Sequence, residues 1–365
     1  MQTCSIHNKI LLSSVLTKEG NKQDWKDKPS SWPDIRRNGQ NGHIYLLCDT
    51  RYPIGLVATV TGGYYVNIDG EFYGDYNSEA QFSMADWSSY TATEGYVIDY
   101  PTGATKAHIL DIYPQNSANI ITNFTNSRVA ASDEEVQGTL WVHFNLDNAI
   151  NFHFTVVGNC RQVYMEALTA KNNTVKIIDS IRDGFYYTKI AYVPVLEGTG
   201  SAVDFYRAFY NTPISEVNTK NIKPSTVAQC FRLGHYLKEA PKFDLSSVSF
   251  AHYYITSATD LKNTVFDFSA ATGLRAVGVC GENGNNFMSG MKGLIVSNQA
   301  PFSGNSPQIN VQYTDMNRTA LAQLFNALPT ISAGQIINIV GCTGTVNLTA
   351  DDELIATAKG WTITK

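Results

Sequence analysis

The chain has 365 residues, which is long enough for two or three domains that each bury a core of their own. Only 16% of the residues are charged, and 27 basic and 32 acidic side chains give a net charge of −5. Because binding to a phosphate backbone needs a basic patch, and the basic residues here are interleaved with acidic ones, this composition argues against a nucleic-acid-binding protein.

The first residues lack the features of a secretory leader. The apolar run from Ile10 to Leu16 is interrupted by Ser13 and Ser14, and no small-residue cleavage site follows it. No stretch of the chain approaches the roughly 20 apolar residues of a transmembrane helix. We therefore expect no membrane insertion, and a protein that is kept in a cytoplasm or released by a route other than secretion.

The cysteines and the short motifs point away from catalysis. No two of the six cysteines have the spacing of a zinc or redox site, and their apolar neighbours predict buried free thiols. The sequence contains no phosphate-binding loop, nucleophile elbow, zinc-protease helix or calcium-binding loop. The glycine-rich stretch from Gly281 to Asn286 is interpreted as a loop insertion. We expect no catalytic residues, no metal and no cofactor.

The N-terminal part is expected to contain an arm and a β-domain. Residues 1–40 are polar with mixed charges and are interpreted as an arm or docking segment. Over residues 41–125, short apolar or alternating runs are separated by Gly, Asn, Asp and Pro at intervals of about ten residues, a spacing typical of an all-β sandwich. The predicted fold class is mainly β with some α.

One hairpin in this region is predicted in detail. The strands Tyr64–Ile68 and Glu71–Tyr73 flank Asp69 and Gly70, which supply the positive φ angles of a two-residue type I′ turn. Tyr64, Tyr65 and Tyr73 are candidates for a surface that recognises a sugar. Tyrosines that simply cover a sheet are the more common alternative.

Residues 126–180 link the two halves of the chain. Two apolar strands are expected here, TLWVHF and INFHFTVV. They could close the first domain or cap the N-terminal end of the repeat that follows, and we favour the cap. His143 and His153 lie on these neighbouring strands and could hold a metal as a pair, although hydrogen-bonded histidines are more common in such strands.

The second half of the chain has a repeat of 22 to 24 residues. Buried aromatic residues are expected once in each repeat, at Phe185, Phe209, Phe231, Tyr254 and Phe287. An aliphatic core residue follows each aromatic, at Ile190, Ile214, Leu237, Leu261 and Met291. Short strands follow, among them the nearly identical FDLS and FDFS runs. Because one such unit cannot bury its apolar face alone, stacking on its neighbours must do so, which predicts a leucine-rich-repeat-like solenoid over residues 126–365.

The end of the chain is expected to close this solenoid. Leu321, Leu324, Phe325 and Leu328 follow helical spacing and predict a helix from Asn317 to Ala327, which Pro329 stops. Strands are expected at Ile309–Tyr313, Ile336–Val340 and Trp361–Thr364. Residues 330–365 are interpreted as the C-terminal cap, and the acidic run Asp351–Glu353 is expected to lie in a solvated loop.

The repeat pattern resembles that of BspA-like leucine-rich-repeat proteins, in which an aromatic, an aliphatic and a short strand recur. The stretches that share this resemblance are SWPDIR (31–36), GGYYVNIDG (62–70), RVAAS (128–132), EALTAKNN (166–173), LFNALP (324–329), IINIVGC (336–342) and IATAKGWTIT (355–364). Similar stretches occur in repeat proteins encoded among the prophage tail genes of gut bacteria. The regular spacing is lost after Leu261.

The resemblance implies a non-enzymatic bacteriophage virion protein, a tail, baseplate or fibre component that faces the host cell. Its expected partners are other virion proteins, a host surface protein or glycan, and further copies of itself in a homo-oligomer, with no nucleic acid. A bacterial BspA-like surface adhesin is the alternative. A glycan depolymerase is a third reading, for which a pair of carboxylates facing each other across a cleft would be needed.

Overall fold

The computed structural model forms two compact units, each described separately below. The described residues are mainly β-strand with few helices, which confirms the predicted class. They are residues 43–49, 54–60, 62–77, 80–84, 88–91, 96–98, 105–116, 121–127, 140–146, 154–157, 164–165, 168–170, 174–177, 180–186, 193–282, 286–303, 306–332 and 334–365. The expected arm, residues 1–40, lies outside them.

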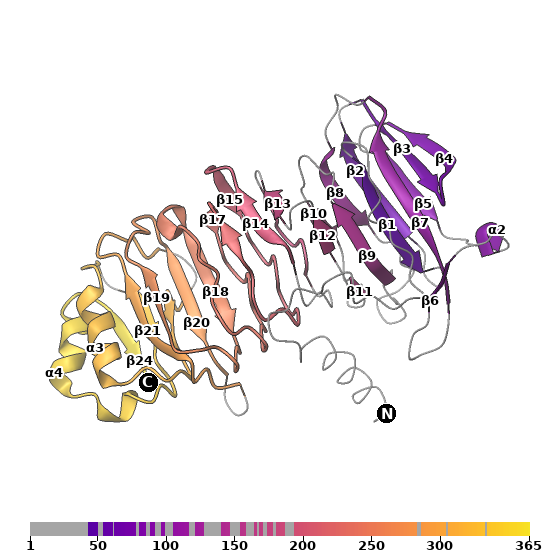
Figure 1. Cartoon of the computed structure of the whole chain (residues 1–365). Helices are drawn as coiled ribbons and strands as arrows, with labels where there is room; N and C mark the ends of the chain where they lie inside the picture. The colour runs from indigo at the N-terminus through magenta and orange to yellow at the C-terminus, as the bar shows by residue number, and fades with distance from the viewer. Residues whose placement is uncertain are drawn as a thin grey trace. The chain divides into compact units, whose positions relative to one another are not determined.

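The N-terminal unit contains two sheets (Figure 1). The first sheet is made of β1 (Ile44–Asp49), β3 (Tyr64–Ile68), β4 (Glu71–Tyr76), β6 (Tyr96–Ile98), β7 (Thr105–Pro114), β9 (Leu140–Leu146), β11 (Tyr164–Met165) and β12 (Leu168–Ala170). The second contains β2 (Ile54–Val60), β5 (Gln81–Met84) and β8 (Ile121–Ser127). A short helix, α2 (Ser88–Thr91), follows β5. In the first sheet, the order β1-β7-β3-β4 is antiparallel throughout.

The predicted hairpin is confirmed. Strands β3 and β4 pair in antiparallel fashion, and Ile68 lies opposite Glu71 across the turn. Asp69 and Gly70 have φ angles of 54° and 94°, as a type I′ turn requires. Alternate residues of β3, beginning with Tyr64, are buried, so this strand has one core face and one outer face.

One of the two strands expected to cap the repeat belongs to the first sheet. β9 pairs with β1, and β11 and β12 pair in parallel with β9. The interpretation as a solenoid cap is therefore corrected for TLWVHF, whereas residues 153–156 of INFHFTVV, which include most of β10 (Phe154–Val157), belong to the C-terminal unit. The physical reason is that β7 covers only one edge of β1. β9 pairs with the other edge and satisfies its backbone donors and acceptors.

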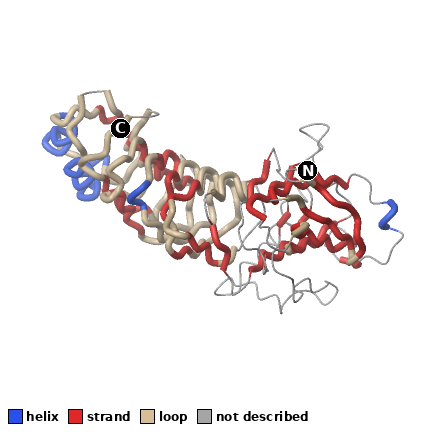
Figure 2. The backbone as a smooth tube through the Cα atoms, turned by 90° about the horizontal axis from the view of Figure 1, so that it is seen from above, coloured by secondary structure: helices blue, strands red, loops and turns tan. Residues whose placement is uncertain are grey.

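The C-terminal unit is built on a parallel sheet whose strands follow the order of the chain, as the labels and colours of Figure 1 show. Figure 2 shows successive turns of this unit side by side, with short strands between loops. It contains β15 (Ala202–Asp204), β17 (Lys223–Thr226), β18 (Phe250–Thr256), β20 (Ala276–Cys280), β22 (Ile309–Asn310), β23 (Ile336–Asn338) and β24 (Thr362–Thr364). The connecting segments pair as well, through β13 (Thr174–Ile177), β14 (Val195–Gly198) and β16 (Thr219–Lys220), and through β19 (Thr264–Phe268) and β21 (Met291–Val296). Each turn of the chain therefore lies against the next.

Backbone hydrogen bonds continue between turns where the strands end. The amides of Phe185, Phe209 and Phe231 donate to the carbonyls of Ala208, Cys230 and Tyr254, at 2.8 to 2.9 Å. At the same corner of each turn the chain enters the left-handed region, at Asp183, Arg207, Gln229 and Tyr253. This conformation costs a side-chain-bearing residue about 1–2 kcal/mol, so the bonds to the neighbouring turn must hold it in place.

Aromatic residues contact one another inside these turns, stacked from Phe185 to Phe231 and edge-to-face from Phe231 to Tyr254. Phe185, Phe209, Phe231 and Tyr254 are at most 1% exposed. The ring centroids lie 5.1 Å apart from Phe185 to Phe209, 5.2 Å from Phe209 to Phe231 and 6.0 Å from Phe231 to Tyr254. The aliphatic positions Ile214, Leu237, Leu261 and Met291 are also buried, and Ile190 lies outside the described residues.

The expected aromatic at Phe287 is corrected. Its side chain is only partly buried, whereas the neighbouring Met288 is fully buried and pairs with Thr314 in an isolated bridge. The column of paired aromatic positions ends at Phe231, because Phe231 pairs with Ile255 and Ile255 pairs with Val279 in the following turns. Tyr254 meets Phe231 edge-on beside this column. Ile255, Val279, Val311 and Ile339 are all at 0% exposure and fill the core of the later turns.

The two similar Asp-containing runs adopt different structures. FDFS lies at the end of strand β19, as expected, but FDLS leads into a 3₁₀ turn, Leu245–Ser247, rather than a strand. In both runs the aspartate accepts a hydrogen bond from the backbone amide two residues later, at Asp244 and Asp267. The shared sequence therefore determines this local turn, whereas the surrounding residues determine whether each run pairs as a strand.

The C-terminal end of the unit contains two helices. The predicted helix is confirmed as α3 (Arg318–Ala327), with Asn317 accepting a hydrogen bond from the amide of Ala320. Lys359 donates to the carbonyls of Phe325, Asn326 and Leu328 at the end of α3, and so satisfies groups that have no partner within the helix.

The acidic run Asp351–Glu353 is also corrected, because it forms the first turn of helix α4 (Ala350–Thr357) instead of a loop. Asp352 completes a capping box with Thr349 and accepts hydrogen bonds from both Nε and Nη2 of Arg318, at 2.8 and 3.3 Å. These contacts, those of Arg318 first, hold the pKa of Asp352 well below its usual range. Negative charge at a helix N-terminus is favourable, which explains why this run can be helical.

Gly290 is required where two turns approach closely. A Cβ at this position would lie 1.7 Å from the carbonyl oxygen of Leu261. We expect Gly290→Ala to lower the free energy of unfolding by about 3 kcal/mol. The matched control is Gly273→Ala, where a Cβ meets no atom within 4 Å and the backbone is outside the left-handed region. Guanidinium denaturation of both variants tests this, and an equal effect of the two would contradict it.

Asp352 predicts an acid-dependent loss of stability. Because its pKa is lower in the folded than in the unfolded chain, its contribution is present above the unfolded value of about 3.9 and is lost as the pH falls further. We expect Asp352→Asn to lower the Tm at pH 7 and to flatten its decline between pH 4 and pH 2. Thermal unfolding over this range, with the exposed neighbour changed in Asp351→Asn as control, tests the assignment; parallel curves for wild type and Asp352→Asn would reject it.

Candidate recognition surface

The outer face of the first sheet carries a group of aromatic and polar side chains, here called the aromatic face. The strand register places Tyr65 opposite Tyr113, and Asn67 between Asp111 and Phe72. Side chains of directly paired residues lie on the same face of a sheet. Since Tyr64, Val66 and Ile68 are buried on the opposite face, the outer residues of β3 are Tyr65 and Asn67.

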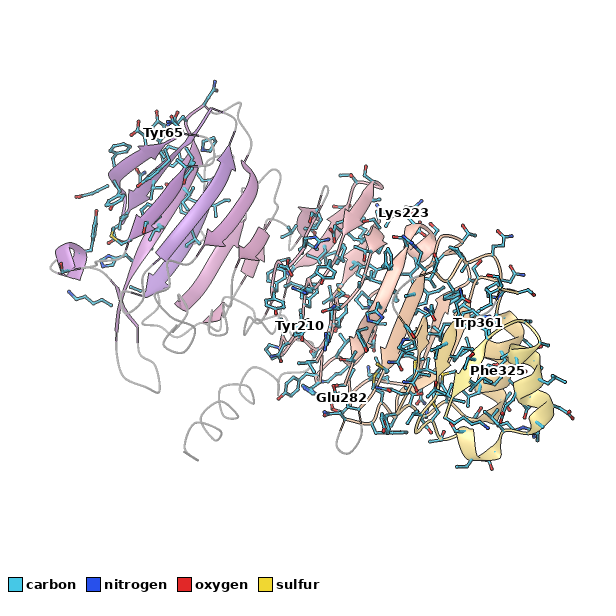
Figure 3. The ribbon with its side chains drawn as sticks, turned by 180° about the vertical axis from the view of Figure 1, so that it is seen from behind. Tyr65, Tyr210, Lys223, Glu282, Phe325 and Trp361 are labelled. Atoms are coloured by element: carbon cyan, nitrogen blue, oxygen red, sulfur yellow. The ribbon has the colours of Figure 1, made fainter. Side chains whose placement is uncertain are left out.

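The rings of this face contact one another across β7, β3 and β4, together with His43, which directly precedes β1. His43 stacks on Tyr113 with centroids 4.4 Å apart, Tyr113 lies 5.3 Å from Tyr65, and Tyr65 lies 6.0 Å from Phe72. His43 and Tyr113 are largely or half-buried, whereas Phe72 is 64% exposed. The row therefore runs from a buried histidine to a solvent-exposed ring, and Tyr65 is labelled in Figure 3.

Polar groups lie beside the rings. His43 Nδ1 is 2.8 Å from Asp111 Oδ1, a contact that fixes both side chains at the base of the row. The Oδ1 atom of Asn67 is buried and has no hydrogen-bond donor among the described residues. A buried acceptor without a donor is unfavourable by about 1–3 kcal/mol, so this amide gains from any donor that reaches it.

Only one of the three tyrosines proposed from the sequence lies on this face. Tyr65 does, but Tyr64 is 0% exposed, stacks on Tyr76 and donates its hydroxyl to the carbonyl of Ala80. Tyr73 is on the other side of β4, against Phe82. The expectation of a surface role is therefore corrected for Tyr64, because the two-residue period of the strand turns it into the core.

The sequence alone did not identify five residues of this face as candidates for recognition: His43, Asn67, Phe72, Asp111 and Tyr113. The sequence did contain a signal, because buried and outward-facing residues alternate in β7 and in β3. Ile112 is buried between Asp111 and Tyr113, as Val66 is buried between Tyr65 and Asn67. The pairing of these strands brings the two signals together, and that pairing joins residues far apart in the chain.

The described residues include no group of three or more His, Cys, Asp or Glu side chains placed to hold a metal ion. His143 and His153 were expected as a possible metal-binding pair. The side chain of His143 and all of His153 lie outside the described residues. His43 is hydrogen-bonded to Asp111. No described serine or cysteine is hydrogen-bonded to His43, so this pair has no such nucleophile beside it among the described residues.

Three of the cysteines are free and buried, as expected: Cys230, Cys280 and Cys342. Burial raises the pKa of each thiol, that of Cys280 to about 12. They are neutral at physiological pH and act as small apolar core groups. No described helix is long and apolar enough to cross a membrane.

Comparisons with protein-family models, with curated proteins and with solved structures found no match to this chain. The function must therefore be inferred from the surfaces of the protein itself.

Adjacent tyrosines of β3 offer a direct test of the face assignment. We expect Tyr64→Ala to destabilise the N-terminal unit by about 3–5 kcal/mol, the usual effect of removing a buried aromatic ring. Tyr65→Ala should lower stability by only about 1 kcal/mol, because its side chain is partly exposed. Urea unfolding followed by circular dichroism measures both, and a larger loss for Tyr65→Ala would show that the two faces are reversed.

Proposed function

We propose that this chain is a non-enzymatic bacteriophage virion protein, a tail, baseplate or fibre component, that recognises a glycan on the host surface through its aromatic face. The observation that carries the proposal is the row of His43, Tyr113, Tyr65 and Phe72 beside the acceptors of Asn67 and Asp111. Aromatic rings pack against the C–H faces of sugars, and a few fixed polar groups orient the hydroxyls. The virion location rests on the sequence resemblance alone.

The architecture we propose agrees with this role. The two sheets of the N-terminal unit form a β-sandwich, and the C-terminal unit is a leucine-rich-repeat-like solenoid with its cap at α3 and α4. Support for the solenoid comes from the parallel strands in chain order and the stacked rings of Phe185, Phe209 and Phe231. Such coils present long surfaces for contacts with other proteins, including further copies of the same chain.

A glycan-binding assay with two matched variants tests the aromatic face. We expect the purified chain to bind one or more members of a bacterial surface-glycan array, and the double variant Tyr65→Ala/Phe72→Ala to bind them at least about tenfold more weakly. Tyr236→Ala is the control, because Tyr236 is an exposed tyrosine (38%) of the C-terminal unit. Equal binding by the double variant and wild type would remove the aromatic face from the proposal.

The location is tested separately by immunogold electron microscopy of purified particles and of cell envelopes. Label on the virion is the expected result. Label confined to the envelope would favour a surface adhesin. Release of reducing sugar from a glycan that the protein binds would instead identify a depolymerase.

A further inference from the structure

A second surface, on the C-terminal unit, is formed by arginine and tyrosine side chains at the corner where each turn enters the left-handed region. Its cations are Arg182, Arg207 and Arg232, one from each of three successive turns. We call this set, with the tyrosines that contact it, the Arg–Tyr ribbon. Figure 3 labels Tyr210 at the edge of the unit where the ribbon lies, and Lys223 at the opposite edge.

The ribbon is continuous across the turns. The ring of Tyr206 lies between two guanidinium groups, with its centroid 4.4 Å from Cζ of Arg182 and 4.6 Å from Cζ of Arg207. Tyr186 and Tyr210 are 5.0 Å apart. Arg232 lies over both Tyr210 and Tyr253, at 5.5 and 5.1 Å.

These contacts occupy the flat faces of the guanidinium groups and leave hydrogen-bonding capacity unused. The buried Nε of the Arg207 guanidinium has no hydrogen-bond partner among the described residues. Asp183, in the adjacent turn, likewise has a buried Oδ1 without a donor among the described residues. Arg182 is paired with Asp204 at 2.8 Å. The edge of a stacked guanidinium is suited to bidentate binding of a carboxylate.

Donors and acceptors therefore alternate along a surface lined with tyrosine rings. Parallel turns lie about 4.8 Å apart, a spacing close to the length of one sugar ring. A polyphosphate would meet repulsion from Asp183 and Asp204 and has no hydroxyl donors to offset it. A neutral glycan would leave Arg207 without a carboxylate. A uronic-acid polymer offers both a carboxylate for the Arg207 guanidinium and hydroxyl donors for Asp183.

We propose that the Arg–Tyr ribbon is a binding site for an acidic polysaccharide that runs across the turns, separate from the aromatic face and its glycan. Arg207 binds the sugar carboxylate, and Asp183 accepts a hydrogen bond from a hydroxyl. This inference goes beyond the proposed function, since it uses different residues on the other unit.

Affinity electrophoresis of the full chain in gels containing polygalacturonate tests the site, with dextran and polyphosphate as comparison polymers. Wild type is retarded by polygalacturonate only. Arg207→Met, which keeps the aliphatic stem, weakens retardation at least about tenfold. Lys223→Met, which removes a cation from the opposite edge, leaves retardation unchanged. Absence of retardation in wild type, equal retardation by polyphosphate, or an equal effect of Lys223→Met overturns the proposal.

Asp183→Asn separates recognition from simple charge attraction, since asparagine tolerates the left-handed backbone at this position. If Asp183 accepts a sugar hydroxyl, the substitution weakens retardation by polygalacturonate. If the ribbon only attracts anions, loss of a negative charge strengthens it, and the proposed site is wrong. This variant also keeps the test decisive if Arg207→Met fails to fold, and Tyr65→Ala/Phe72→Ala is expected to be retarded like wild type.

Discussion

The structure of the C-terminal unit depends on one constraint: each turn satisfies its backbone hydrogen bonds with the next turn. Amides such as Phe185, Phe209 and Phe231 donate across the boundary to carbonyls of the following turn. A buried amide without a partner is unfavourable by about 1–3 kcal/mol. The left-handed corners, the close approach at Gly290 and the stacked rings all follow from holding adjacent turns in this register.

The same register aligns side chains as well as backbone. Inside the turns it places Phe209 between Phe185 and Phe231, where apolar burial stabilises the stack. Outside, it places Tyr206 between two guanidinium groups. In the N-terminal unit, antiparallel pairing has a similar effect, because it places alternate residues of β3 and β7 on the same face of the sheet. Both candidate surfaces are therefore products of strand pairing.

Sequence reasoning succeeded where the signal was local. The Asp69–Gly70 turn and the helix between Asn317 and Pro329 are set by residues within a few positions of one another. It failed where distant pairing decides: β9 joins β1 across about a hundred residues. Tyr64 and Tyr65 could not be assigned to faces from the sequence, since tyrosine suits either face and the phase of the strand comes from its partners.

The length of the turns carries a further consequence. The offset between paired residues changes along the unit: it is 24 where Thr226 pairs with Phe250 and 32 where Val277 pairs with Ile309. It also changes within single ladders, between Val203 and Asp204 and between Ala251 and Ile255. Pairing resumes beyond each of these shifts, so turns of different length still align their side chains with the next turn.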